Sequence, residues 1–182
     1  MDKGAELYQK YLSGDKDALG ELVRIYRDGL ILYVNGIVRN IHEAEDICEE
    51  TFVSLVFKKP RFGERCSFHT WLFGIARNLA YDEMRKMKRL PRTELDEKTP
   101  DGVSVEETLI KNETKKKLRD ALKKLPSGKY ELIWLTYFEG MSAKEVAAVT
   151  GKSEGAVFAA LTRTRAELKE ILRKEGFDNE DL

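Results

Sequence analysis

Residues 140–157 constrain the fold of this chain more than any other segment, because their sequence predicts two short helices joined by a tight turn. Ser142 is placed to cap the first helix, and Glu145 three residues later completes a capping box. Gly151 supplies the left-handed residue that ends this helix, and Ser153 is placed to cap the next one. The pattern predicts a helix-turn-helix whose second helix fits a DNA major groove, with an ordinary helical hairpin as the alternative.

Composition and charge exclude several classes of function. The 182 residues fit one domain of ordinary size or two small ones. The 32 basic and 32 acidic side chains cancel, which argues against a uniformly basic coat for non-specific nucleic-acid binding. The charges are nevertheless segregated, because residues 77–92 are mainly basic and residues 93–107 mainly acidic.

The residue types that carry catalysis, metal binding or membrane insertion are sparse. The chain has two cysteines without a Cys-x-x-Cys spacing and two isolated histidines, so we expect no disulfide scaffold, no metal and no cofactor. Cys48 is expected to lie in the core. No nucleophile–base pair or phosphate loop is present, so we do not expect an enzyme. The first four residues carry no apolar run, and the longest apolar stretch, near 30–34, is too short to span a bilayer. The expected location is the cytoplasm.

Apolar side chains recur at spacings of three and four through the first 90 residues, which predicts helices rather than strands. One helix begins after Asp15, and a second spans about 42–57. Residues 58–67 contain a proline and a glycine and are expected to form a loop. Ser67 then opens a third helix, in which Trp71 falls on the buried stripe and is expected to pack in the core.

A polar, acidic segment with two prolines and no helical stripe follows at 91–105, and we expect it to be a flexible linker. After it come a helix that ends at Pro126, a short apolar helix over 130–138 and the helix-turn-helix. The predicted fold is therefore all-α, with two small helical domains at 1–90 and 106–182.

The motifs of both domains, in this order, resemble the bacterial RNA polymerase sigma factors of the extracytoplasmic-function (ECF) group of the sigma-70 family. Region 2 of that family carries a motif like Ala-Glu-Asp-Ile-x-Gln-Glu-x-Phe, and residues 44–52 read Ala-Glu-Asp-Ile-Cys-Glu-Glu-Thr-Phe. A second pattern, like Phe-x-Thr-Trp-Leu-x-x-Ile-Ala-x-Asn, is matched by residues 68–78. Region 4 is similar at residues 125–126, 137–142, 145–147, 155–157 and 161–165.

The resemblance implies a region 2 bundle of three or four helices and a region 4 helix-turn-helix. It implies a subunit that binds core RNA polymerase and directs promoter-specific transcription initiation, without catalysis. The implied partners are core RNA polymerase, promoter DNA and, as in many relatives, an anti-sigma factor. The resemblance assigns polymerase binding to an acidic stripe of Asp46, Glu49 and Glu50, for which a solvated helix face is the alternative.

The loop at 58–67 and the helix after it correspond to the family's element for capturing unpaired bases of the −10 promoter element. Melting needs basic side chains for phosphates and a pocket or aromatic platform for a flipped base. The residues that offer these chemistries are Arg61, Phe62, Arg65, Asn78, Arg85, Lys86, Lys88 and Arg89. Two roles stay open for Phe62, which either stacks on a base or anchors the loop in the core.

The helix-turn-helix corresponds to the reader of the −35 element, with Lys144, Lys152, Ser153, Phe158, Arg163 and Arg165 as its candidate residues. Family members commonly show Gly-Thr-Val-Lys-Ser-Arg-Leu where residues 155–161 read Gly-Ala-Val-Phe-Ala-Ala-Leu, so two basic side chains are missing. An Arg–guanine contact provides about 1–3 kcal/mol of discrimination. We therefore expect weaker or unusual −35 recognition, with Phe158 contacting thymine methyls or buried against an inhibitory partner.

Two other functions fit parts of the sequence. A helix-turn-helix regulator without polymerase contact would have no need of the region 2 motifs. A polymerase-binding interaction protein with weakened DNA recognition is favoured by the depleted recognition helix.

Overall fold

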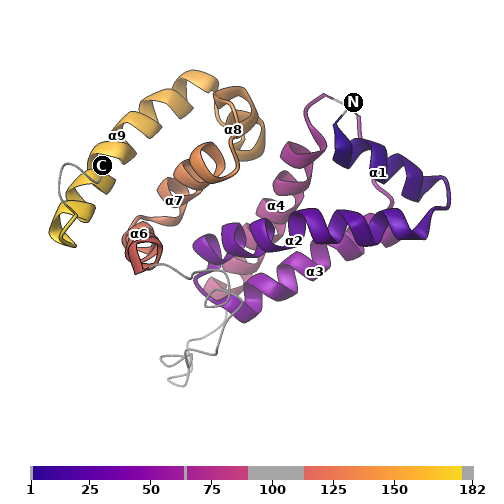
Figure 1. Cartoon of the computed structure of the whole chain (residues 1–182), viewed down its shortest axis with the longest axis horizontal. Coiled ribbons are helices and arrows are strands. Elements are labelled where there is room, and N and C mark those ends of the chain that lie inside the picture. The colour runs from indigo at the N-terminus through magenta and orange to yellow at the C-terminus, as the bar shows by residue number, and fades with distance from the viewer. Residues whose placement is uncertain (1, 64, 90–112, 178–182) are drawn as a thin grey trace.

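The computed structural model describes residues 2–63, 65–89 and 113–177, with side chains described in these ranges except at 113–117. An N-terminal bundle contains α1 (Lys3–Leu12), α2 (Lys16–Val38), α3 (Ile41–Phe57) and α4 (Phe68–Arg89). A C-terminal bundle contains α6 (Glu113–Lys123), α7 (Ser127–Ile133), the π-helix η1 (Trp134–Phe138), α8 (Ala143–Thr150) and α9 (Glu154–Lys174). The two bundles lie side by side, with α7 and α8 against α2 and α4 (Figure 1).

The expectation of an all-α fold with two helical domains is confirmed over the described residues. The expected linker at 91–105 lies outside them, and so do residues 106–112 of the expected second domain. No helix in the described ranges combines the length and the apolar character needed to cross a bilayer.

The predicted helix caps are confirmed at both ends of the chain. The Asp15 carboxylate accepts hydrogen bonds from the first backbone N–H groups of α2. Ser142 and Glu145 form the complete capping box of α8, and Gly151 ends that helix in the left-handed region at φ 69°. Ser153 accepts from the backbone N–H of Ala156 and begins α9. These local bonds fix the turn between α8 and α9.

The helical periodicity does not predict α1 as a separate helix, and a contact distant in sequence accounts for its position. Asp2 caps α1 by accepting from the Gly4 N–H at 2.8 Å, and its second oxygen accepts from the Phe68 N–H at the start of α4. Gly4 permits close packing, because a Cβ there would lie 2.5 Å from both the Phe68 ring and the Tyr26 hydroxyl.

An aromatic cluster fills the space where α1, α4 and the 58–67 loop meet. Phe62, Phe68 and Trp71 lie with ring centroids 5.3–5.7 Å apart, in tilted and edge-on geometries. Phe68 is fully buried, and Phe62 is only 8% exposed. Of the two roles open for Phe62, anchoring the loop in the core is therefore correct, and the ring has no free face for a base. Trp71 packs in this cluster as expected.

The expected single helix over 130–138 is instead α7 followed by a π-helical turn. In that turn the Glu139 N–H reaches back five residues to the Trp134 carbonyl at 3.1 Å. The Trp134 and Phe138 rings stack with centroids 4.4 Å apart. A π turn commonly marks a place where side chains are re-aimed for function. Here it brings the Glu139 carboxylate within hydrogen-bonding distance of Trp134 Nε1.

We expect Phe68→Ala to lower the free energy of unfolding of the N-terminal bundle by about 3–5 kcal/mol, because it leaves a cavity beside Phe62 and Trp71. Phe57→Ala is the matched control, since that ring is 82% exposed and its loss should change stability by less than about 0.5 kcal/mol. Urea unfolding followed by circular dichroism measures both. Equal losses in the two variants would contradict the assignment of the core.

Candidate functional site

The outer side of α3 presents an acidic stripe that continues into an apolar end. Asp46, Glu49 and Glu50 are all exposed, as the sequence predicts for a docking stripe. One and two turns later on the same side lie Val53 at 47% and Phe57 at 82% exposure. Sequence reasoning missed these two, although their spacing of three and four from the acidic positions was the available signal.

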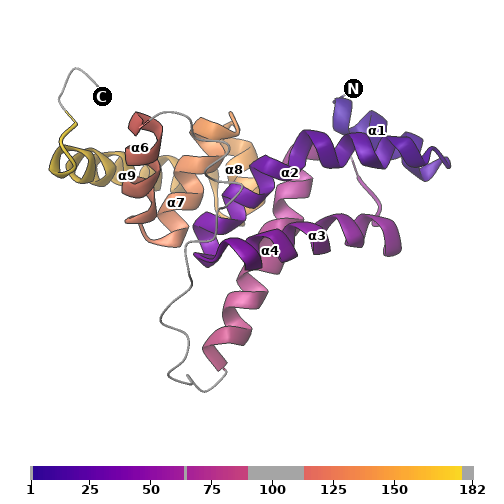
Figure 2. The same ribbon diagram turned by 60° about the horizontal axis from the view of Figure 1, so that its bottom comes forward.

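The residues expected at the −10 element lie in the loop and along the outer part of α4. Arg61 and Arg65 are exposed on either side of the buried Phe62, and Asn78 is exposed one turn beyond Gly74. The C-terminal half of α4 projects from the bundle in Figure 2, and it carries Arg85, Lys86, Lys88 and Arg89.

The basic end of α4 is partly neutralised by acidic side chains of the same helix. Arg85 pairs with Asp82, and Lys86 pairs with Glu83 at 2.9 Å. Both cations are more than 60% exposed, so these pairs are weak. A groove of about 410 Å³ runs between this segment and Glu50 of α3. The basic segment therefore lies beside the acidic stripe.

The helix-turn-helix exposes an unusually apolar reading surface. Val157 and Leu161 are buried and fix α9 against its bundle, whereas Phe158 is 57% exposed at its first turn. Ser153, Lys144, Lys152 and Arg163 are exposed as well. Arg165 lies farther along α9, on the rim of an apolar groove of about 450 Å³ between α6, η1 and α9. Arg165 follows Phe158 by seven residues, so it lies about two turns farther along the same face of α9.

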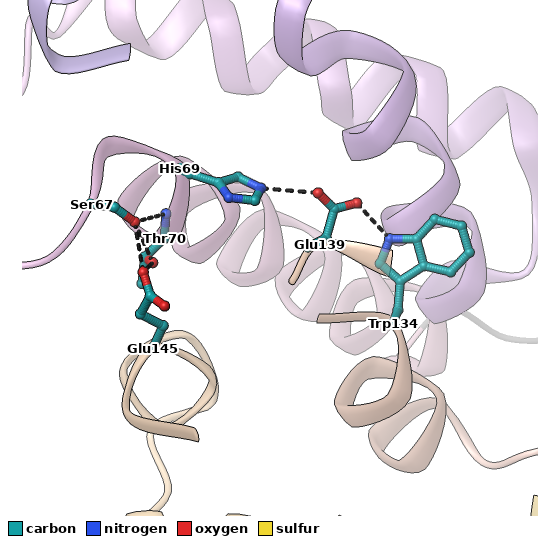
Figure 3. A network of polar contacts seen from close by, with 6 residues as sticks. All are labelled: Ser67, His69, Thr70, Trp134, Glu139 and Glu145. Atoms are coloured by element: carbon teal, nitrogen blue, oxygen red, sulfur yellow. Dashed lines mark hydrogen bonds and ion pairs between the residues drawn. The ribbon is translucent and has the colours of Figure 1, made fainter. Parts of the chain in front are cut away.

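Two carboxylates of the C-terminal bundle hold the first turn of α4 (Figure 3). Glu145, besides closing its own capping box, accepts from Ser67 Oγ at 3.0 Å and from Thr70 Oγ1 at 3.1 Å. Glu139 bonds His69 Nε2 through one oxygen and accepts from Trp134 Nε1 through the other, both at 2.9 Å. His69 is therefore engaged by a carboxylate.

A third carboxylate, Glu131 of α7, is only 1% exposed and is hydrogen-bonded by two side chains of α4. It accepts from Arg77 Nε at 2.5 Å and from the Tyr81 hydroxyl at 2.8 Å. Burial and the adjacent carboxylate raise the pKa of Tyr81 well above its ordinary value. Sequence reasoning missed this cluster, although a lone carboxylate inside the apolar run 130–135 was a signal for a buried partner.

The two thiols differ in accessibility. Cys48 is buried in the core as predicted, and burial raises the pKa of its thiol to about 12. Cys66 precedes Ser67 and is partly exposed; burial and the carboxylates of Glu145 and Asp2 raise its pKa less strongly. In the described part of the chain, no three His, Cys, Asp or Glu side chains gather in a way that could hold a metal ion.

Family models match both bundles of the chain. The model described as Sigma-70 region 2 matches residues 22–90, and the model described as Sigma-70, region 4 matches residues 115–168. The chain is 31% identical over 173 residues to the ECF RNA polymerase sigma factor SigW of Bacillus subtilis, covering 88% of this chain and 91% of that one. It is 28% identical to the RNA polymerase sigma factor CarQ of Myxococcus xanthus, covering 90% and 94%.

Two solved structures share the fold. CnrH in complex with the cytosolic domain of CnrY superposes with a TM-score of 0.69 at 27% identity, over 95% of this chain and 99% of that one. The sigma factor RpoE of Bartonella quintana, in complex with the anti-sigma factor NepR, gives a TM-score of 0.65 at 22% identity, over 85% and 96%. The second likeness bears on the fold alone.

We expect Glu145→Gln to make the free energy of unfolding depend less on pH in the acid range. Although burial raises the Glu145 pKa, hydrogen bonds from Ser142, Ser67 and Thr70 outweigh it and hold the pKa below its ordinary value. The carboxylate therefore stabilises the fold above its unfolded pKa, and that contribution is lost as pH falls through the folded value.

Urea unfolding at pH 7 and at steps below pH 4.5 measures this effect, with Glu154→Gln, an exposed carboxylate of α9, as the control. Glu145→Gln should be less stable than the native chain at pH 7 and should converge with it in acid. Parallel curves at all pH values would contradict the assignment.

Proposed function

The chain belongs to the ECF group of the sigma-70 family and directs promoter-specific transcription initiation by RNA polymerase, and we propose that it does so through three surfaces. In this proposal residues 1–90 act as region 2, which binds polymerase and melts the −10 element. Residues 106–182 act as region 4, which reads the −35 element, and residues 91–105 connect them. The observation that carries the proposal is the exposed acidic–apolar side of α3 next to the basic end of α4.

The polymerase-docking surface consists of Asp46, Glu49 and Glu50 together with Val53 and Phe57. An exposed acidic stripe favours a basic partner surface and accelerates its encounter. Large apolar side chains that become fully buried supply most of the binding energy of an interface. Phe57 is the strongest candidate for such an anchor, because no fold contact accounts for a ring that is 82% exposed. The partner surface is therefore basic with an apolar recess.

The −10 surface consists of Arg61, Arg65 and Asn78 with the basic end of α4. Weak, exposed pairs at Arg85 and Lys86 exchange readily for phosphate contacts. Lys88 and Arg89 are exposed and extend this path. Phe62 is omitted because its ring is buried, so a flipped base needs another pocket.

The −35 surface centres on Phe158. Apolar side chains recognise thymine in the major groove through its methyl group, and an exposed phenyl ring at the first turn of α9 suits this contact. Lys144, Lys152, Ser153 and Arg163 are exposed and supply phosphate contacts that set position without reading sequence. Arg165, about two turns beyond Phe158, is exposed and also lines the apolar groove.

Further aspects of the proposal follow from the family. The chain acts in the cytoplasm with polymerase and promoter DNA, and it contributes binding rather than catalysis. An anti-sigma protein is proposed as an additional partner, because the structurally similar CnrH is in complex with the cytosolic domain of CnrY.

In vitro transcription with core RNA polymerase and a library of promoter fragments tests the proposed function. Initiation from a discrete promoter class supports it. A shift of duplex DNA without any polymerase binding would favour a helix-turn-helix regulator. Polymerase binding without transcripts would favour an interaction protein that has lost DNA recognition, which the apolar recognition helix would then explain.

We expect Asp46→Lys with Glu49→Lys to weaken binding to core polymerase by about tenfold or more, equivalent to about 1.4 kcal/mol. Phe57→Ala should weaken binding comparably without loss of fold. Glu170→Lys on α9 is the control for a charge reversal away from the stripe. Fluorescence titration with core polymerase measures all three, and affinities equal to that of the native chain would rule out the docking surface.

We expect the holoenzyme to lose affinity when the −35 thymines of its promoter are replaced by deoxyuridine, which lacks the methyl group. The loss should be about fourfold for each contacted methyl, from about 0.8 kcal/mol of apolar burial. Phe158→Ala should weaken binding and abolish this sensitivity.

Arg163→Ala is the matched control, since a phosphate contact should weaken both DNAs equally and lower the log–log salt slope by about 0.9. If the native holoenzyme bound thymine and deoxyuridine promoters equally, Phe158 would not read the methyl group.

A further inference from the structure

The start of α9 exposes a phenyl ring beside a threonine. Phe158 is 57% exposed, and Thr162, which follows it by four residues, is exposed as well. Side chains four residues apart on a helix are neighbours, with Cβ atoms about 5–6 Å apart. Val157 and Leu161, each one position earlier, are buried against the bundle and hold this part of α9 in place. Phe158 and Thr162 therefore form one outward-facing pair.

The hydroxyl group of Thr162 is already used by the helix. Its Oγ1 donates to the Phe158 carbonyl at 3.0 Å, a bond that threonine commonly makes to the preceding turn. Thr164 makes the same kind of bond to the Ala160 carbonyl at 2.8 Å, but it is only 1% exposed, so its methyl group packs inside the bundle. Of these two threonines, only Thr162 can present its methyl group to a ligand.

Basic side chains before and after this pair along the chain favour DNA as its ligand. Lys152 precedes α9, and Arg163 and Arg165 follow Thr162; all three are exposed. Their charge complements the phosphates that border the major groove. The apolar group that a base presents in that groove is the C5-methyl group of thymine, which Phe and the Thr methyl group contact well. The pair therefore fits a pyrimidine that carries a methyl group at C5.

Such a contact distinguishes bases by their methyl group. Thymine and 5-methylcytosine share the C5-methyl group but differ in the polar group beside it, a carbonyl in one and an amine in the other. Neither the Phe158 ring nor the Thr162 methyl group hydrogen-bonds to that polar group. The nearby acceptors, Thr162 Oγ1 and the exposed Glu154 one turn before Phe158, can bind the amine, but they bind it in cytosine and 5-methylcytosine alike.

We propose that Phe158 and Thr162 together form a contact site for the C5-methyl group of a pyrimidine in the −35 element, either thymine or 5-methylcytosine. The proposal rests on the proposed function of α9 as the reader of that element, and it adds Thr162 as a specificity-determining residue. A cytosine at this position is bound more tightly when it is methylated at C5. Initiation from such a promoter is therefore sensitive to cytosine methylation.

Holoenzyme made from core polymerase and the full-length chain tests the proposal on a promoter selected by the transcription assay. Each thymine position of its −35 element is replaced in turn. Four duplexes carry thymine or deoxyuridine opposite adenine, or 5-methylcytosine or cytosine opposite guanine. Competition binding at one salt concentration gives two affinity ratios, thymine over deoxyuridine and 5-methylcytosine over cytosine. We expect both ratios to be about fourfold at the contacted position, as for the burial of one methyl group.

Substitutions of the exposed pair show which group makes the contact. Thr162→Ser removes the methyl group and keeps the hydroxyl, so both ratios should fall to about twofold or less. Thr162→Val keeps the methyl group and replaces the hydroxyl, so both ratios should stay at the native value or rise. Phe158→Ala should bring both ratios to about one. Circular dichroism checks that each variant is folded.

A ratio of one for 5-methylcytosine over cytosine at every position would overturn the proposal, because the methyl group would then not be read on its own. Ratios lowered by Thr162→Val but not by Thr162→Ser would also overturn it, since the hydroxyl would then be the reading group. A selected −35 element without thymine would do the same. If no promoter is selected at all, the proposed function itself fails and this inference falls with it, an outcome distinct from the other three.

Discussion

The pairing of buried Glu131 with Arg77 and Tyr81 is the interaction on which the arrangement of this molecule depends. A carboxylate that is 1% exposed must be paired and hydrogen-bonded, because removing one partner from such a pair costs about 3–5 kcal/mol. Here both partners come from the other bundle. The docking of the C-terminal bundle on α4 therefore satisfies the charge of Glu131.

The Glu145 carboxylate makes both local and distant hydrogen bonds. It completes the capping box of α8, which is part of the helix-turn-helix itself, and it holds Ser67 and Thr70 at the start of α4. The bonds between Ser142 and Glu145 are local, so they fix the start of α8 without help from α4. Glu139 behaves similarly, since its bond to Trp134 lies within one bundle and its bond to His69 joins the two.

Features that depend on neighbours in sequence could be predicted, and features that depend on distant partners could not. The caps at Asp15, Ser142 and Ser153 and the buried side of α3 follow from local hydrogen bonding and from the helical period. The helix α1 and the Glu131 cluster arise from contacts between residues fifty or more positions apart, which leave no periodic signal. Phe62 could not be assigned from the sequence. An aromatic residue in a loop can stack on a base or anchor the loop in the core, and only its neighbours in the fold distinguish these roles. The docking and DNA-binding residues are exposed side chains whose roles were predicted by resemblance and stay proposals.

A distance measurement between the bundles tests the central claim most directly. Spin labels on Arg24→Cys of α2 and Ala166→Cys of α9, in a Cys66→Ser background, report their separation by pulsed electron resonance; both positions are exposed. The pairing of Glu131 predicts one short, narrow distance in the free chain. A long, broad distribution of distances would contradict it.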